Sequence, residues 1–129
     1  MKIGRLSKLS DCSIQTIRYY EKEGLIDPPQ RSEGNFRLYD ELALSRLKFI
    51  RRCRTLDITL AEIRQLLDLQ QTPSESCGQI SDMIDHHIVD VKNKLEELKA
   101  LENELQGLRK KCHDGTVIDE CGIMENLSK

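Results

Sequence analysis

The sequence predicts a mainly helical fold: a winged helix-turn-helix head with a small β-hairpin wing, a long antiparallel coiled-coil dimerisation helix and a C-terminal loop. Two short helical segments joined by a tight turn precede a hairpin signal within the first 40 residues. Apolar residues then recur at steps of seven between residues 77 and 112. We therefore expect a head at 1–72, a dimerisation helix at 73–111, and a loop with a tail at 112–129.

The first two helices have the spacing of a helix-turn-helix. Residues 3–8 form a short helix in this prediction, and Ser13 after the turn is a suitable N-cap for a second helix at 14–23, which Gly24 ends. The residues expected to face inward are Ile14 and Ile17. The residues expected to face outward are Gln15, Thr16, Arg18 and Tyr19. Donors and an aromatic ring on the second helix are typical of DNA recognition.

A hairpin is predicted between residues 31 and 39, because Gly34 and Asn35 form a two-residue turn signal after a Pro-Pro break. Four residues there have side chains that can contact phosphates and groove edges: Arg31, Asn35, Arg37 and Tyr39. A solvated hairpin without a ligand is the alternative.

Two further helices complete the predicted head. Asp40 can cap a helix that runs to Leu56, and Thr59 with Glu62 forms a capping box for a fourth helix. The side chains expected to be buried in these two helices are Leu47, Ile50, Cys53, Ile63, Leu66 and Leu67. Cys12 and Cys53 are interpreted as small core residues.

The long helix is predicted from its heptad stripe, which includes Ile84, Val91, Leu98 and Leu105. Ser76 and Gln79 have capping-box spacing, which would place Cys77 at the first helical position, where the helix dipole favours a thiolate. Cys77 and Cys112 are 35 residues apart, so they share one face but lie about 50 Å apart in one chain. Antiparallel pairing of two helices would bring Cys77 of one chain to Cys112 and Cys121 of the other.

These three cysteines are the predicted metal ligands, because thiolates from two chains form a site for a soft divalent ion. His113 beside Cys112 is a weaker candidate for a fourth ligand, and His86 and His87 are interpreted as polar interface residues. The alternatives for the cysteines are inert thiols or a redox pair in which Cys112 and Cys121 form a disulfide.

Charge and composition narrow the class of protein. Residues 1–55 hold 12 Lys and Arg against 7 Asp and Glu, net +5, whereas the remaining residues carry −7. A basic head with an acidic tail fits nucleic-acid binding. The sequence has no apolar stretch of about 20 residues, which predicts no membrane association, and no secretory signal, which predicts a cytoplasmic protein. No nucleophile–base pairing or phosphate-binding glycine loop indicates an enzyme.

Several motifs resemble those of MerR-type transcriptional regulators. In the head they are Thr16-Ile17-Arg18-Tyr19-Tyr20-Glu21, Gly24-Leu25 and Arg37-Leu38-Tyr39. The segment 49–57, together with Cys77-Gly78 and Cys121-Gly122-Ile123, resembles the branch that responds to cadmium and lead. The resemblance covers essentially the whole chain.

The resemblance implies a homodimer that binds double-stranded promoter DNA whose spacer between polymerase elements is too long. Metal binding would distort the DNA and realign those elements for RNA polymerase. Residues Thr16, Arg18 and Tyr19 match recognition-helix positions, and Arg31, Asn35, Arg37 and Tyr39 match the wing. Cys77 matches the cysteine from one protomer, and Cys112 with Cys121 the pair from the other.

The resemblance also implies which ion induces transcription. Regulators of copper and gold lack the first cysteine, so Cys77 argues against that branch. Cd(II) or Pb(II) is the expected ion, and Hg(II) or Zn(II) is the alternative within the same family. Outside this class, a thiol redox sensor and a metal-buffering protein without a DNA role are the competing hypotheses.

Overall fold

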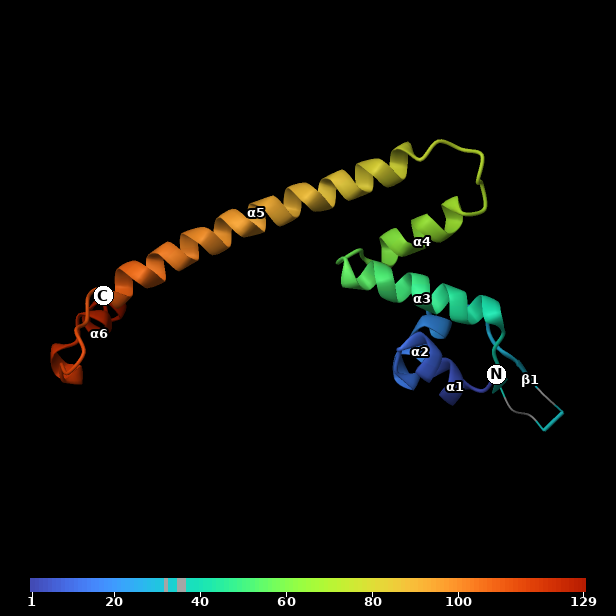
Figure 1. The fold of residues 1–129 in the computed structure, drawn as a ribbon, viewed down its shortest axis with the longest axis horizontal. Coiled ribbons are helices and arrows are strands. Elements are labelled where there is room, and N and C mark those ends of the chain that lie inside the picture. Colours follow the sequence, from blue (N-terminus) through green and yellow to red (C-terminus); the bar gives the residue numbers. More distant parts are fainter. Residues whose placement is uncertain (32, 35–36) are drawn as a thin grey trace. The chain divides into compact units, whose positions relative to one another are not determined.

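A computed structural model describes residues 1–31, 33–34 and 37–129, with Arg37 described by its backbone alone. The fold is mainly helical, as expected, and its contacts divide the chain into two units, Met1–Glu75 and Ser76–Lys129 (Figure 1). Within the described residues, no helix is both long enough and apolar enough to cross a bilayer.

The head begins with the predicted helix-turn-helix. Helix α1 spans Ile3–Ser10 and α2 spans Ile14–Lys22. The turn between them passes through the left-handed conformation at Asp11, with φ of 57°. The Ser13 hydroxyl caps α2 by accepting the Thr16 amide, as predicted. The inward face was only partly predicted: Ile17 is fully buried, whereas Ile14 at the first position of α2 is 40% exposed.

The wing is a two-stranded antiparallel sheet. Strand β1 spans Gln30–Arg31 and β2 spans Arg37–Leu38, with Gln30 opposite Leu38 and Arg31 opposite Arg37. The predicted turn residue Asn35 lies outside the described residues.

Helices α3 (Glu41–Thr55) and α4 (Leu60–Leu69) complete the head. Both predicted caps form: the Asp40 carboxylate accepts the Ala43 amide, and Thr59 and Glu62 make a reciprocal capping box. The largest fully buried side chains are Leu6, Ile17, Leu25, Ile26, Leu47, Ile50 and Ile63. Cys12 and Cys53 are buried as expected. Leu66, expected to be buried, is half-buried.

The second unit consists of α5 (Gly78–Arg109), a short 3₁₀ helix η1 (Ile118–Glu120) and α6 (Gly122–Leu127). The predicted capping box at its start does not form. Cys77 is the N-cap itself rather than the first helical residue, and it makes no capping hydrogen bond. The Ser76 hydroxyl instead accepts the Gly78 amide two residues on, at 3.2 Å.

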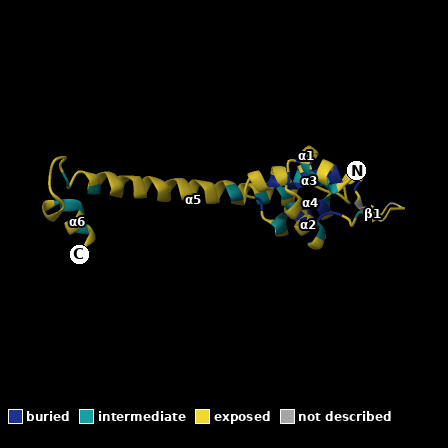
Figure 2. Ribbon diagram, turned by 90° about the horizontal axis from the view of Figure 1, so that it is seen from below, coloured by how far each residue is buried: buried dark blue, intermediate teal, exposed yellow. Residues whose placement is uncertain are grey.

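The apolar stripe of α5 is exposed along its length in this single chain. Figure 2 shows the helix almost entirely in the colour of exposed residues. The exposed fractions are 39% for Ile84, 52% for Val91, 60% for Leu98 and 57% for Leu105. Isolated exposed leucines are common on protein surfaces, but a row at heptad spacing is typical of a helix that packs against another helix.

Candidate DNA-binding face and thiol site

Helix α2 presents the predicted recognition residues on its outer face. Arg18 and Tyr19 are exposed, and the Tyr19 ring lies 5.9 Å from that of the buried Tyr20. Thr16 is half-buried, and its hydroxyl accepts a 2.8 Å hydrogen bond from Ser13. A guanidinium, a phenol and a hydroxyl on one short helix can donate to phosphates and base edges.

Tyr39 lies in the interior of the head, although the sequence placed it among the DNA contacts. Its side chain is 3% exposed, and its hydroxyl donates a 2.9 Å hydrogen bond to Glu21 on α2. Its backbone also exchanges hydrogen bonds with Met1, whose carbonyl accepts the Tyr39 amide at 2.7 Å. The geometry therefore gives Tyr39 a structural task, which is to fix the end of the wing against the recognition helix. Glu21 accepts the hydrogen bond that holds Tyr39 in place. From the sequence, Glu21 was named only as part of the 16–21 motif, and no role was predicted for it.

The wing supplies further basic side chains. Arg31 on β1 is exposed, and the backbone register sets it opposite Arg37 on β2. Asn35, also predicted to contact DNA, is outside the described residues. The exposed guanidinium of Arg31 can contact a phosphate of the DNA backbone.

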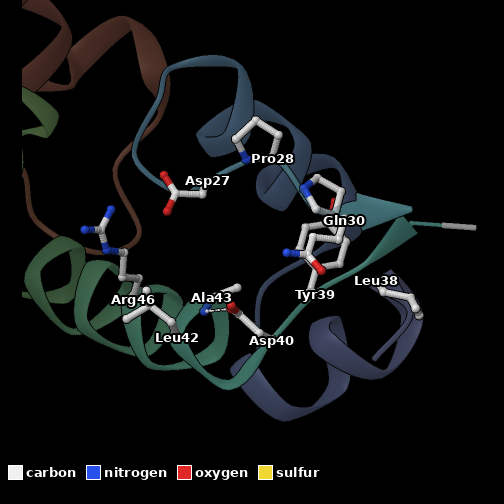
Figure 3. Close-up of a pocket in the computed structure, with 10 residues that line it drawn as sticks. Asp27, Pro28, Gln30, Leu38, Tyr39, Asp40, Leu42, Ala43 and Arg46 are labelled. Atoms are coloured by element: carbon white, nitrogen blue, oxygen red, sulfur yellow. Dashed lines mark hydrogen bonds between the residues drawn. The ribbon is translucent and has the colours of Figure 1, made fainter. Parts of the chain in front are cut away.

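A hollow of about 320 Å³ lies between the base of the wing and α3 (Figure 3). Among the residues that the structure describes, its lining includes the carboxylates of Asp27 and Asp40 and one guanidinium, that of Arg46. The Arg46 guanidinium already has a partner within the protein, because it donates a 3.4 Å hydrogen bond to the carbonyl of Leu25. Two carboxylates beside one cation disfavour a phosphate group, so we do not include this hollow in the DNA-binding face.

Helix α3 is tied to the helix-turn-helix by a charged contact. The Arg51 guanidinium lies 2.8 Å from the Asp11 carboxylate, and its Nε donates to the Asp11 carbonyl at 3.1 Å. Both side chains are largely exposed, so the ion pair itself contributes little to stability. The contact supports the left-handed turn that joins α1 to α2.

At the other end of the chain, two of the three predicted metal ligands lie close enough to interact. The side chains of Cys112 and Cys121 interact with each other, and this interaction raises the pKa of Cys112 and lowers that of Cys121. Backbone N–H groups of Met124 and Ile123 lower the pKa of Cys121 further. Cys121 is the N-cap residue of α6, although its side chain makes no capping hydrogen bond.

The surroundings of Cys121 therefore favour its thiolate, which was not predicted from the sequence. Cys77 is exposed before the start of α5, and the 32 residues of this helix, about 48 Å in length, lie between it and the segment that carries Cys112. Among the described residues of one chain, no three His, Cys, Asp or Glu side chains are grouped so that they could hold an ion. One chain therefore provides a two-thiol site and, at the far end of α5, a single thiol.

His113, considered as a further ligand, lies next to this pair in sequence. Its backbone carbonyl accepts weakly from the Cys112 thiol at 3.8 Å and more strongly from the Thr116 hydroxyl at 2.7 Å. Both contacts are made by the backbone carbonyl of His113 and stabilise the turn after α5. Neither involves the imidazole, so His113 as a metal ligand stays a prediction.

Comparison with known proteins gives consistent matches over the whole chain. The family described as "MerR HTH family regulatory protein" matches residues 1–70, and the one described as "MerR, DNA binding" matches residues 44–108. A curated relative, the HTH-type transcriptional regulator ZntR homolog of Haemophilus influenzae, is 48% identical over 86% of this chain and 82% of its own length.

Solved structures match in the same way. The transcription regulator PbrR691 from Ralstonia metallidurans CH34, in complex with lead(II), is 55% identical, with a TM-score of 0.86 over 98% of each chain. The dual function regulator MerR from Bacillus megaterium MB1, in complex with mercury(II), is 33% identical, with a TM-score of 0.73 over 100% of each chain.

Proposed function

Because this chain belongs to the MerR family of helix-turn-helix regulatory proteins, we propose that it is a metal-responsive transcription regulator. In this proposal a homodimer binds promoter DNA and, on binding Pb(II) or Cd(II), activates metal-resistance genes. The observation that carries it is the division of the thiols: Cys112 interacts with Cys121, while Cys77 is exposed at the other end of α5.

The donor set fits a soft divalent ion. Cys112 and Cys121 are half-buried, their side chains interact, and the surroundings of Cys121 favour its thiolate. Thiolates bind soft ions such as Pb(II), Cd(II) and Hg(II), whereas a structural Zn(II) site takes four ligands. The 55% identical relative solved with lead(II) supports Pb(II). The 33% identical relative solved with mercury(II) keeps Hg(II) as an alternative, and Zn(II) remains the other alternative within the family.

The third thiol would come from a second chain. Two α5 helices packed antiparallel would cover the exposed stripe that contains Leu98 and Leu105, and burial of a leucine contributes about 1.5–3 kcal/mol. The same pairing would bring Cys77 of each chain toward Cys112 and Cys121 of the other. Dimerisation and metal binding would then use one interface.

The DNA would be bound by α2 and the wing. Arg18 and Tyr19 are the exposed recognition residues, Thr16 lies beside them, and Arg31 with Arg37 and Asn35 would contact the backbone from the wing. We assign Tyr39 to the positioning of this surface, because its ring is buried and its hydroxyl bonds to Glu21.

Metal would act on transcription through the dimer. The metal would bind at the ends of α5, whereas the DNA would bind at the heads, so the two sites are separate. Regulation therefore requires that metal binding favours one of two arrangements of the dimer. That arrangement would deform the promoter, at a cost set by the stiffness of its sequence, and align its elements for RNA polymerase.

Transcription from the protein's own promoter, with Pb(II), Cd(II), Hg(II) and Zn(II) compared, tests the proposal. The wild type should respond most strongly to Pb(II) or Cd(II). Cys77→Ser should lose the response while keeping its operator affinity, and Cys12→Ala, which removes a buried thiol of the head, should keep both. A normal metal response from Cys77→Ser would show that the site is assigned wrongly.

The interaction between Cys112 and Cys121 also favours a second candidate, a thiol redox sensor. A redox sensor would respond to mild oxidant in the absence of metal, with a mass loss of about 2 Da as the disulfide forms. Regulation by metal alone, with no response to oxidant, would exclude it.

A further inference from the structure

Gly122 lies directly against the main chain at the end of α5. A Cβ at this position would overlap the carbonyl oxygen of Lys111 and would lie 3.1 Å from its carbonyl carbon and 3.2 Å from its Cβ. The overlapping group is backbone, which cannot rotate away as a side chain would. The two segments approach this closely because Gly122 has no side chain.

This contact joins the neighbours of the two thiols. Gly122 follows Cys121 and is the first residue of α6, and Lys111 precedes Cys112. The close approach of Gly122 to Lys111 therefore brings together the two segments that carry these thiols. We propose that Gly122 is the positioning residue of the two-thiol site, because its lack of a side chain lets the Cys121 and Cys112 segments meet at ligand spacing. This inference rests on the proposed metal site.

Another glycine of the chain provides a matched control. Gly107 lies in α5, in the same unit of the chain, and a Cβ there would have no atom within 4 Å. Alanine at Gly107 should be tolerated, and in a helix interior it is the more favourable residue. A difference between Gly122→Ala and Gly107→Ala would thus report the contact at Lys111 rather than the general loss of a glycine.

A phenyl-substituted trivalent arsenic oxide tests the spacing without metal. One molecule condenses with two thiols, forming two As–S bonds and releasing the arsenic-bound oxygen as water with the two thiol protons. In the Cys77→Ser background, where the intended pair is Cys112 with Cys121, intact mass and titration measure this adduct. Gly122→Ala should weaken it about tenfold or more, while Gly107→Ala leaves it unchanged. Alkylation by a maleimide should modify the same number of thiols in Gly122→Ala and in Gly107→Ala, which shows that both variants keep their thiols reduced.

Metal affinity gives the second readout, in the full chain with Cys77 present. Gly122→Ala should weaken Pb(II) binding about 10- to 100-fold, the usual effect of losing a group that orients a ligand. Operator affinity and dimer mass should stay at wild-type values, which excludes unfolding of the protein as the cause. Equal arsenical affinity in Gly122→Ala and Gly107→Ala would overturn the inference. Failure of the wild type to bind Pb(II), Cd(II), Hg(II) or Zn(II) would instead overturn the proposed function.

Discussion

The hydroxyl of Tyr39 donates a 2.9 Å hydrogen bond to the carboxylate of Glu21, and this contact joins the end of the wing to the recognition helix. Eighteen residues separate the two side chains in sequence. Since Tyr39 is also bonded through its backbone to Met1, three segments of the head meet at one residue. The proposed DNA contacts on α2 and on the wing are therefore held relative to each other by a buried side chain.

Tyr39→Phe should destabilise the head by about 1 kcal/mol, the usual net contribution of one hydrogen bond. The ring remains buried in this variant, so the loss comes from the hydroxyl alone. Urea unfolding followed by circular dichroism measures it. Tyr19→Phe is the control, because Tyr19 is 47% exposed and its change should alter stability by less than about 0.5 kcal/mol. Equal stability of Tyr39→Phe and wild type would contradict the assigned role.

Arg18→Ala should weaken binding to the promoter by about 1–3 kcal/mol, which corresponds to roughly a 10- to 100-fold higher Kd. Arg18 is exposed on α2, and fluorescence anisotropy with labelled promoter DNA at fixed salt measures the change. Lys92→Ala removes an exposed charge from α5 and should leave the Kd unchanged. Unaltered DNA binding in Arg18→Ala would remove the central contact of the proposed face, and the absence of any promoter binding by the wild type would favour a metal-buffering protein.

The stability of the head should fall in alkaline solution. Burial raises the pKa of the Cys53 thiol above its ordinary value of 9.0. Above pH 9 the unfolded chain therefore releases this proton while the folded chain retains it, so stability is lost as the pH rises toward the folded pKa. The slope from this thiol is at most about 1.4 kcal/mol per pH unit. Burial raises the pKa of Tyr20 as well, which adds a loss above pH 10.

Cys53→Ala isolates the contribution of that thiol. The variant should be less stable at every pH, because a buried group is removed, but its stability should decline less steeply between pH 9 and 10. Urea midpoints across this range give the two slopes. Identical slopes would mean that Cys53 does not titrate differently in the folded and unfolded chains.

Leu98→Asp should convert the protein to monomers. Leu98 is 60% exposed in the single chain, and the proposed dimer would bury one copy from each subunit. Replacing both copies should therefore weaken the free energy of dimerisation by about 3 kcal/mol or more, which corresponds to an association constant at least about 100-fold lower. Sedimentation measures the mass. Leu42→Asp is a matched control, because Leu42 is 55% exposed in the first turn of α3, where an acidic residue is favourable. A dimeric Leu98→Asp would place the interface elsewhere.

Much of the fold could be predicted because its signals are local. The caps at Ser13, Asp40 and Thr59 lie within three residues of the amides that they accept, so sequence spacing alone identifies them. The mainly helical fold with its helix-turn-helix was predicted from such signals. The matching relatives are transcription regulators, which confirms the expectation that the chain is not an enzyme.

The remaining features depend on contacts between distant residues. The burial of Tyr39 requires Glu21 and Met1, and no pattern around residue 39 contains that information. Residues 112–129 were expected to be a loop and a tail, yet η1 and α6 form there, and α6 has no side-chain cap to predict its start. For that reason it was not predicted from the sequence that the surroundings of Cys121 favour its thiolate.

The most direct test of the account is the metal stoichiometry of a mixed dimer. One subunit carries Cys77→Ser, and the other carries Cys112→Ser with Cys121→Ser; two different affinity tags select the mixed species after co-expression. If each site takes Cys77 from one chain and the pair from the other, this dimer keeps one complete three-thiol site. We predict that it binds one Pb(II) with wild-type affinity, whereas both parent homodimers lose high-affinity binding. A mixed dimer that binds no better than its parents would contradict a site shared between two subunits.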